Sequence, residues 1–477
     1  MSRTLVCESD QFIAYPEAPN SRANRVLFNA NEAVQGEGQS HRIRIPHNRL
    51  TYIDTTQSWL TFEATTTFKG VGLHLADIRM TPLGAESFIQ NIRVFVNNRL
   101  INEFNDYSKI CAMLQASNVG VGNNFGNSLT AGSGRDASFE NEGQELDPEP
   151  ALADTTVYPI TRQYSFPLIG LMGCGNPKML PVGELTSDIE IQITWGNSWD
   201  AFYQNTTASS TVKIDSINSV FSSVGYSAHV ITVGESVNTE IQKRSRDEDG
   251  IMSWSGQLWS LDARNILTIA QMKSGTHVNN ILSGFRYKSL KNISCSGFNS
   301  DNTNPPYVVG TTNDTRSVPP TNQYGFWGAH NQVRYNIAGR HYPQTYLAAD
   351  SELAAKTNET FGNHFNGTTN NTFCSKGFHY NQRISGVCMS DRVENINVNM
   401  TAPQSLCIVP LEDSEIVGNA GIDTTAVQVV AQHEVDSTGT GNTLFPFDSK
   451  KDLLMCYCAN YDVLYSINKD GIMSVSY

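Results

Sequence analysis

The sequence predicts an all-β protein made of sandwich-like domains, and three observations support this fold class. Charged residues make up 17% of the chain, against about 25% in ordinary soluble proteins, while Asn, Ser, Thr and Gly are plentiful, as in turn-rich β proteins. Short segments with period-two hydrophobic alternation recur between turn clusters, which is typical of a sandwich or jelly roll. The length of 477 residues suits two or three domains, each with its own core.

The first predicted elements lie between residues 43 and 115. Residues 43–62 contain an extended apolar segment, and residues 88–96 alternate between apolar and polar side chains as a strand does. Asn97 and Asn98 predict a turn directly after this strand. Residues 107–114 have the apolar spacing of a short helix.

A strand, a compact Gly/Pro segment and a second strand follow at residues 161–197. An apolar run framed by Pro and Gly turns is typical of a buried strand pair. We therefore expect Phe166, Pro167, Leu168 and residues 180–182 to lie in or beside the core of the first domain.

The boundary between two domains is predicted at about residue 235. Residues 228–233 have the composition of a linker strand, and the mixed acidic and basic stretch at 242–250 is typical of a solvated linker. The predicted organisation is an N-terminal arm at residues 1–40, a first domain at 41–235 and a second domain at 236–477.

The second domain repeats the same pattern of short strands and turns. Residues 253–259 and 266–270 predict two strands, residues 346–355 resemble a helix in composition, and residues 453–464 predict a buried strand. Residues 117–156 and 299–322 are long, polar and rich in Gly, Asn and Thr. Because such segments form no core of their own, they predict loop insertions without catalytic duty.

Several short sequence units occur in a fixed order along the chain. They are Tyr-Ile-Asp at 52–54 with Ser-Trp-Leu at 58–60, Ser-Phe-Ile at 87–89 with Ile-Arg-Val at 92–94 and Asn-Asp-Tyr at 105–107, Phe-Pro-Leu at 166–168 with Leu-Pro-Val at 180–182, and Gly-Arg-His-Tyr-Pro at 339–343. With these units the chain resembles the double jelly-roll major capsid proteins of icosahedral double-stranded DNA viruses, in the polinton, adintovirus and virophage branch.

The resemblance implies two tandem eight-stranded antiparallel jelly rolls with long loop insertions and minor helices. It implies a structural protein whose homotrimers, pseudo-hexameric in outline, tile a viral shell together with neighbouring trimers and with minor capsid or penton proteins. The protein would be located in the virion after synthesis in the cytosol of the infected host cell. The arm at residues 1–39 would run beneath the shell and not pack in its own sandwich. We expect Tyr324, Phe326 and Trp327, beside the second insertion, to form part of the inter-subunit interface.

Charge and hydropathy exclude several function classes. The formal net charge of −13 and the pI near 5.2 argue against a surface that wraps nucleic acid, which needs clustered Lys and Arg, so we expect no sequence-specific nucleic acid binding. No apolar stretch approaches the ~18–20 residues of a transmembrane segment, and the N-terminus lacks a signal-peptide core. The nine cysteines show no CxxC spacing and predict buried free thiols.

The sequence offers few groups for chemistry. Asp188 with Glu190, and the acidic run at 247–249, are carboxylate pairs of the kind that glycosidases use, but such pairs are common on solvated strands and loops. His364, Cys374 and His379 supply too few ligands at irregular spacing for a zinc site. We therefore assign no catalytic, cofactor-binding or metal-binding residue, expect no cofactor, and predict that the protein is not an enzyme.

Two alternative functions remain open at this point. One is a carbohydrate-binding or glycoside-cleaving β-sandwich protein. The acidic pairs and the tryptophans Trp195, Trp199, Trp254, Trp259 and Trp327 favour it, although tryptophan in a β protein is more often core or interface. The other is a minor capsid or vertex protein. Two complete jelly rolls in one chain argue against the second alternative.

Overall fold

The structure is a computed structural model in which the described residues are mostly β, with a few short helices. The described residues are 21–71, 78–80, 84–118, 158–176, 179–204, 213–268, 276–299, 332–347, 407–410, 421–435 and 452–477. None of their helices is long and apolar enough to cross a membrane.

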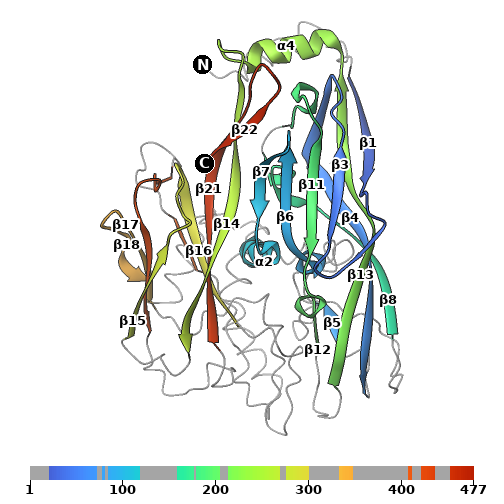
Figure 1. Cartoon of the computed structure of the whole chain (residues 1–477). Helices are drawn as coiled ribbons and strands as arrows, with labels where there is room; N and C mark the ends of the chain where they lie inside the picture. Colours follow the sequence, from blue (N-terminus) through green and yellow to red (C-terminus); the bar gives the residue numbers. More distant parts are fainter. Residues whose placement is uncertain are drawn as a thin grey trace, which may run out of the picture.

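The first half of the chain forms two main sheets (Figure 1). Their strand orders are β1-β13-β4-β8, with β2 added to β13, and β3-β11-β6-β7. The bounds are β1 Ser21–Asn29, β2 Val34–Gly36, β3 Ser40–Ile45, β4 Thr51–Val71, β5 Ile78–Met80, η2 Gly84–Phe88, β6 Ile89–Val96, β7 Arg99–Phe104, α2 Tyr107–Asn118, β8 Tyr158–Phe166, β9 Leu168–Gly170, β10 Gly173–Gly175, η4 Val182–Glu184, β11 Ile189–Trp195, η5 Ser198–Asp200, β12 Phe202–Gln204 and β13 Lys213–Val233.

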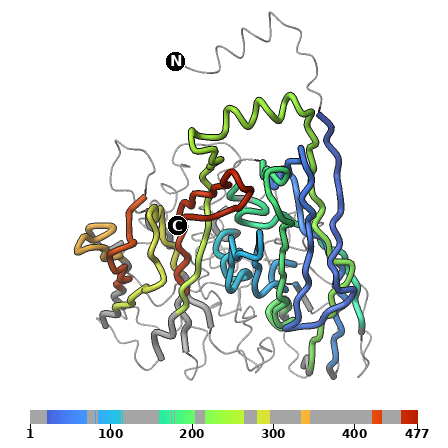
Figure 2. The backbone as a smooth tube through the Cα atoms, turned by 45° about the horizontal axis from the view of Figure 1, so that its top comes forward, coloured from blue at the N-terminus to red at the C-terminus, as the bar shows by residue number. Residues whose placement is uncertain are grey.

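Helix α4, Glu235–Ser245, leads into the second half, which again forms two main sheets. Their orders are β14-β21-β16-β19, with β22 added to β21, and β15-β20-β17-β18. The bounds are β14 Met252–Thr268, β15 Thr276–Leu282, β16 Leu290–Asn299, β17 Gln332–Ile337, β18 Arg340–Leu347, β19 Cys407–Pro410, β20 Val429–Val435, β21 Asp452–Ile467 and β22 Met473–Ser476. Figure 2 shows the two halves standing side by side.

Both halves have the strand order of a jelly roll. Each half has eight strands when the short strands β2, β5, β9, β10, β12 and β22 are left out. When these eight strands are numbered in chain order, the two sheets have the orders 1-8-3-6 and 2-7-4-5 in both halves. Neighbouring strands in these sheets are antiparallel. The predicted pair of tandem eight-stranded jelly rolls is therefore confirmed, although the halves share no recognisable sequence repeat.

The core of the first jelly roll is aromatic. Trp195 at the end of β11 is fully buried and stacks on Phe221 of β13, with ring centroids 3.9 Å apart. Phe62 of β4 packs edge-on against the same tryptophan at 4.9 Å. The indole Nε1 of Trp195 donates a hydrogen bond of 2.7 Å to Nδ1 of His41. Burial lowers the pKa of His41 despite the opposing charge of Glu32, so this imidazole is held neutral inside the sandwich.

Local sequence signals account for the elements beside this core. Strand β6 alternates buried and less buried side chains, as predicted for residues 88–96. Asn97 and Asn98 then adopt positive φ values of 53° and 56°, the conformation of a type I′ hairpin turn. Helix α2 confirms the predicted helix and extends it to Asn118.

The predicted N-terminal arm overlaps strands β1 and β2, which pair with β13 of the first jelly roll. Residues 21–29 form β1, which pairs with β13 from Ser21↔Val233 to Asn29↔Gly225. The prediction that residues 1–39 lie outside their own sandwich is therefore wrong for this strand and for β2. Most side chains of β1 are exposed. The strand is therefore held in the sheet by main-chain pairing with β13 and not by burial of an apolar face. Residues 1–20 lie outside the described residues.

Other predicted boundaries also change. Residues 228–233 are the end of β13 and not a separate linker strand, because they pair with β1 and β4. The two strands predicted at 253–259 and 266–270 are one strand, β14, which pairs along its length with β21. The linker contains helix α4.

Two further expectations fall partly outside the described residues. Residues 346 and 347, predicted to begin a helix, instead end β18, and residues 348–355 are not described. Of the two insertions, only the first two residues of 117–156, at the end of α2, and residue 299, at the end of β16, are described.

Candidate functional site

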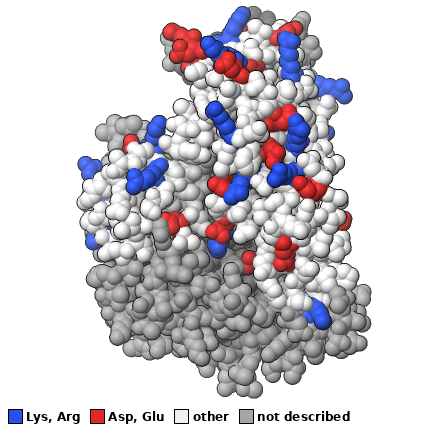
Figure 3. Space-filling view, viewed as in Figure 1, with Lys and Arg blue, Asp and Glu red and all other residues white. Residues whose placement is uncertain are grey.

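The carboxylates that the sequence singled out are engaged in ordinary structural contacts. Asp188 forms an ion pair with Arg44 and a hydrogen bond of 3.1 Å with Nδ1 of His47. Its burial acts to raise its pKa, but the hydrogen bonds from His47 and Arg44 together outweigh burial and hold the pKa below its usual range. Glu190 lies 3.9 Å from Arg42. Figure 3 shows acidic and basic side chains interspersed on this face.

The acidic run at 247–249 closes a turn. The Asp247 carboxylate accepts hydrogen bonds from the backbone N–H groups of Ile251, at 2.8 Å, and of Asp249, at 3.1 Å. Within the described residues, no group of three or more His, Cys, Asp or Glu side chains is arranged to hold a metal ion. His364, Cys374 and His379 lie outside the described residues.

A polar pocket of about 380 Å³ lies between α2, η5 and the turn before β3. Its charged groups already have partners. Lys109 Nζ lies 2.9 Å from Asp106, and Glu37 accepts hydrogen bonds from Ser198 Oγ and from the Ser219 N–H. Burial acts to lower the pKa of Lys109, but the neighbouring acids raise it overall, so the lysine stays a cation. These charged side chains of the pocket are therefore engaged in structural contacts.

The two jelly rolls contact each other over a region that we call the seam. The seam is the contact of β14 and β22 with β7, β9, β10 and α2, together with the anchoring of helix α4. It combines apolar packing, close backbone approach and polar bonds. Because it fixes one jelly roll on the other, it determines the shape that the subunit presents to any partner.

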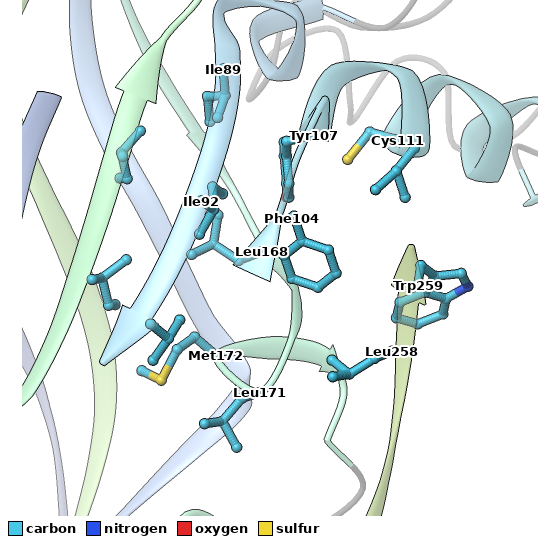
Figure 4. Close-up of a cluster of buried hydrophobic side chains, with 14 of the residues drawn as sticks. Ile89, Ile92, Phe104, Tyr107, Cys111, Leu168, Leu171, Met172, Leu258 and Trp259 are labelled. Carbon is cyan, nitrogen blue, oxygen red and sulfur yellow. The ribbon is translucent and has the colours of Figure 1, made fainter. Parts of the chain in front are cut away.

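An apolar cluster fills the middle of the seam (Figure 4). Leu258 and Trp259 of β14 come from the second jelly roll, and Leu168, Phe104 and Cys111 come from the first. Each side chain is at most 9% exposed. Full burial of a large apolar side chain stabilises a protein by about 1.5–3 kcal/mol, so this cluster is a substantial part of what joins the halves.

Two glycines bring the backbones of the two halves together. Gly175 of β10 has a φ of +110°, and a Cβ at this position would lie 2.8 Å from the backbone oxygen of Gln257 in β14. A Cβ on Gly256 would in turn lie 3.2 Å from the backbone oxygen of Gly175. Glycine tolerates both the positive φ and the close approach, which a side chain would prevent.

Buried Asn176 links the two halves beside these glycines. Its Nδ2 donates to Thr55 Oγ1 of β4 at 3.2 Å, and its Oδ1 accepts from Nε1 of Trp254 in β14 at 3.1 Å. The amide is 1% exposed. A buried polar group must be hydrogen-bonded to avoid a large desolvation cost, so both halves are required to satisfy this side chain.

The C-terminal hairpin fastens one end of the seam. In the turn between β21 and β22, the carbonyl of Gly471 accepts from the Thr186 N–H at 3.2 Å and from Asn97 Nδ2 at 3.5 Å. The Tyr477 hydroxyl donates to the carbonyl of Ile101 in β7 at 3.3 Å. Residues more than 280 positions apart in the chain are thereby joined.

Several polar contacts hold helix α4 on the first jelly roll, and Glu184 accepts three of the hydrogen bonds among them. The Glu184 side chain, 7% exposed, accepts hydrogen bonds from Gln242 Nε2 and from Arg246 Nη2, both at 2.6 Å, and from Asn238 Nδ2 at 3.4 Å. The three donors lie in or directly after α4. Glu184 therefore anchors the linker.

Replacing Glu184 with Ala is expected to lower the free energy of unfolding by about 2–3 kcal/mol, because charge-assisted bonds are lost and the partly buried Arg246 loses its counter-ion. Denaturant unfolding measures the change. Glu240→Ala is the matched control: Glu240 is half exposed and pairs with Arg244 at 2.8 Å within the same helix, so its loss should cost at most about 0.5 kcal/mol. Equal effects would contradict the anchoring role.

Alkaline pH is expected to loosen the same anchor. The Tyr52 hydroxyl donates to Asn238 Oδ1 at 2.6 Å, and burial, followed by the charge of Glu184, raises the pKa of Tyr52 to about 12. The unfolded chain loses this proton near pH ~10, so the folded state binds more protons between these values. Stability is therefore fully present below about pH 10 and falls as the pH rises towards 12. Tyr52→Phe should flatten this fall, and an unchanged pH profile of unfolding would contradict the assignment.

The structure places the remaining predicted residues as follows. Phe166, Leu168 and residues 180–182 are buried as expected, but Pro167 is exposed, because it lies between the strands β8 and β9 and not within either. Among the tryptophans, Trp195, Trp254 and Trp259 are buried and Trp199 is partly buried. Trp327 lies outside the described residues, as do Tyr324 and Phe326.

Comparison with known proteins shows the fold. No family model and no curated protein match the sequence. The PBCV-1 virus capsid structure aligns over 97% of this chain and 98% of its own, with a TM-score of 0.59 and 10% identity. The mavirus major capsid protein aligns over 97% and 91%, with a TM-score of 0.58 and 10% identity. The Sputnik virophage structure aligns over 96% and 89%, with a TM-score of 0.56 and 11% identity. The chain shares the double jelly-roll fold of these capsid proteins.

Proposed function

We propose that this chain is a major capsid protein that forms the shell of an icosahedral double-stranded DNA virus. The main observation in support of the proposal is that the chain contains two complete jelly rolls of identical strand order, which are joined through the seam. The structural likeness to viral capsid proteins, which covers almost the whole chain, supports it.

The architecture suits a shell subunit mechanically. Each sandwich pairs most of its strand edges internally, which protects a protein made at high concentration from edge-to-edge aggregation. The seam holds the two sandwiches together as one structural unit. The carboxylates and the pocket described above are occupied by structural contacts, which favours a structural role over an enzymatic one.

Assembly partners follow from the same proposal. The chain forms a homotrimer of pseudo-hexameric outline, contacts neighbouring trimers, and meets minor capsid or penton proteins in the virion after synthesis in the host cytosol. Its jelly rolls comprise residues 41–235, extended at the start by β1 and β2, and residues 236–477. Tyr324, Phe326 and Trp327 are covered only in the oligomer, because obligate interfaces are rich in aromatic side chains.

Light scattering on the purified protein tests the proposal. The expected mass is three times the 52.6 kDa of the chain, and electron microscopy should show trimers with a six-cornered outline. A carbohydrate-active sandwich protein of this length would commonly be monomeric or dimeric. A stable monomer at micromolar concentration would contradict both the trimer and the shell function.

A further inference from the structure

The buried imidazole of His41 has two nitrogens in different surroundings. Nδ1 accepts the hydrogen bond of 2.7 Å from Nε1 of Trp195, whereas Nε2 has no hydrogen-bond partner among the described residues. Because an indole N–H can donate but not accept, Nδ1 is unprotonated, and the proton of the neutral ring is on Nε2. The geometry therefore fits the neutral imidazole and fixes its tautomer.

A second proton on this ring can bind at Nδ1 and nowhere else. Protonated Nδ1 is a hydrogen-bond donor, and it would face the indole N–H of Trp195, which is also a donor. The hydrogen bond between the two rings would be lost. The imidazolium would also be a charge in a fully buried position, which is costly unless the charge is paired. Acid must therefore displace His41, Trp195 or both.

Trp195 holds the two sheets of the first jelly roll together. Its strand, β11, lies in one sheet beside β3, whereas β13 and β4 lie in the other (Figure 1). The indole stacks on Phe221 of β13 at 3.9 Å and packs against Phe62 of β4 at 4.9 Å. Trp195 is also one of the residues that line the polar pocket described above. Displacement of this side chain would therefore weaken the contact between the sheets beside a polar pocket.

The charged groups around His41 do not supply a counter-ion for an imidazolium. Burial lowers the pKa of His41, and the charge of Glu32, which acts to raise the pKa, does not outweigh it. Glu32 already accepts the backbone N–H of Arg42 at 2.8 Å.

The strands that contact β3 are β1, β11 and β13, and their charged side chains have other surroundings. Arg25 of β1 donates to the carbonyl of Gln57 at 3.1 Å, and Arg22 lies near the other end of β1, opposite Thr232. Glu190 of β11 lies 3.9 Å from Arg42. His229 of β13 lies 4.0 Å from Asp54. On the turn before β3, Glu37 accepts hydrogen bonds from Ser198 and Ser219.

The direction of the pH dependence follows from this burial. In the unfolded chain a histidine gains its proton near pH ~6.5, whereas in the folded chain burial holds the pKa of His41 lower. The unfolded state therefore binds more protons just below pH ~6.5. The stability that His41 contributes is fully present above this pH and falls as the pH decreases below it.

We propose that His41 is an acid-sensitive switch of the first jelly roll: in mildly acidic surroundings the imidazole gains a proton, its bond to Trp195 breaks, and the two sheets loosen around this tryptophan. The inference goes beyond the proposed function, since the switch acts within one subunit whether or not the subunit assembles. In a shell, every copy would contain the same switch, so acid would weaken the wall at one residue in all subunits.

Amide hydrogen exchange of the full chain, followed by mass spectrometry, tests the switch at the peptides that contain β3 and β11. Protection there, corrected for the intrinsic pH dependence of exchange, should fall by up to about tenfold for each pH unit between pH ~6.5 and ~5.5. His41→Asn should remove most of this fall, because the amide oxygen can accept the bond from Trp195 but does not titrate.

His47→Asn is the matched control. The His47 side chain is 51% exposed and lies 3.1 Å from Asp188, so its replacement should leave the fall in protection as large as in the unmodified chain. An equal fall in His41→Asn would overturn the proposal, and so would constant protection of β3 and β11 in the unmodified chain. The second measurement needs no variant, so it decides even if His41→Asn does not fold. Neither result bears on the mass of the assembled protein, which tests the shell function separately.

Discussion

Replacing Leu168 with Asp is expected to lower the free energy of unfolding by about 3–5 kcal/mol. Leu168 begins β9, is 1% exposed, and lies in the apolar cluster of the seam. A carboxylate at this position would be buried among mostly apolar side chains, and an unpaired buried charge is among the most destabilising changes known in proteins. Soluble yield and thermal unfolding of the purified variant measure the effect.

Leu464→Asp is the matched control, because the same substitution is made at a position in β21 that is 49% exposed. Its melting temperature should stay close to that of the unmodified protein. A Leu168→Asp variant with native yield and melting temperature would show that β9 does not lie in the core.

Replacing Gly175 with Ala is expected to lower the free energy of unfolding by about 2–6 kcal/mol. The positive φ of 110° costs a residue with a side chain about 1–3 kcal/mol. The new methyl group would also lie within 3.0 Å of the Trp259 ring and closer still to the backbone of Gln257, and such overpacking typically costs about 1–3 kcal/mol more. Because the obstacle includes backbone, the two jelly rolls must move apart. Denaturant unfolding followed by tryptophan fluorescence measures the loss.

Gly38→Ala separates the two causes of this effect. Gly38 also has a positive φ, of 72°, but a Cβ there would meet nothing within 4 Å. Replacing Gly38 should therefore show only the cost of the positive φ, about 1 kcal/mol in the free energy of unfolding. If Gly38→Ala and Gly175→Ala destabilise equally, close approach of the two backbones contributes nothing to the seam.

The parts of the fold that the sequence predicted depend on short-range patterns. Strand β6, the Asn97 and Asn98 turn and helix α2 each carry their own periodicity or turn signal within about ten residues, so they are visible without knowledge of the tertiary fold. The burial of Phe166 and Leu168 follows from the same local reasoning. The exposure of Pro167 does not, because it depends on how the chain turns between two strands.

The seam depends on contacts that no local pattern contains. The Gly-Cys-Gly sequence at 173–175 contains no local signal of its role. Its last glycine allows the close approach of β14, which lies about 80 residues further along the chain. Asn176 gives no signal that its partners are Thr55 and Trp254. The incorporation of β1 was missed for the same reason, since its partner β13 lies 200 residues away.

The strand order also determines when the protein can fold during synthesis. In each half the first strand pairs with the last: Ser21 with Val233, and Met252 with Ile467. The first sandwich therefore closes only after residue 233 has left the ribosome, and such non-local pairing is slow. Domains that emerge first fold first, whereas the contact of Gly471 with Thr186 forms only after residue 471 has left the ribosome. We therefore expect truncated chains to contain a closed first half with an open seam, so that unfinished translation products are excluded from assembly.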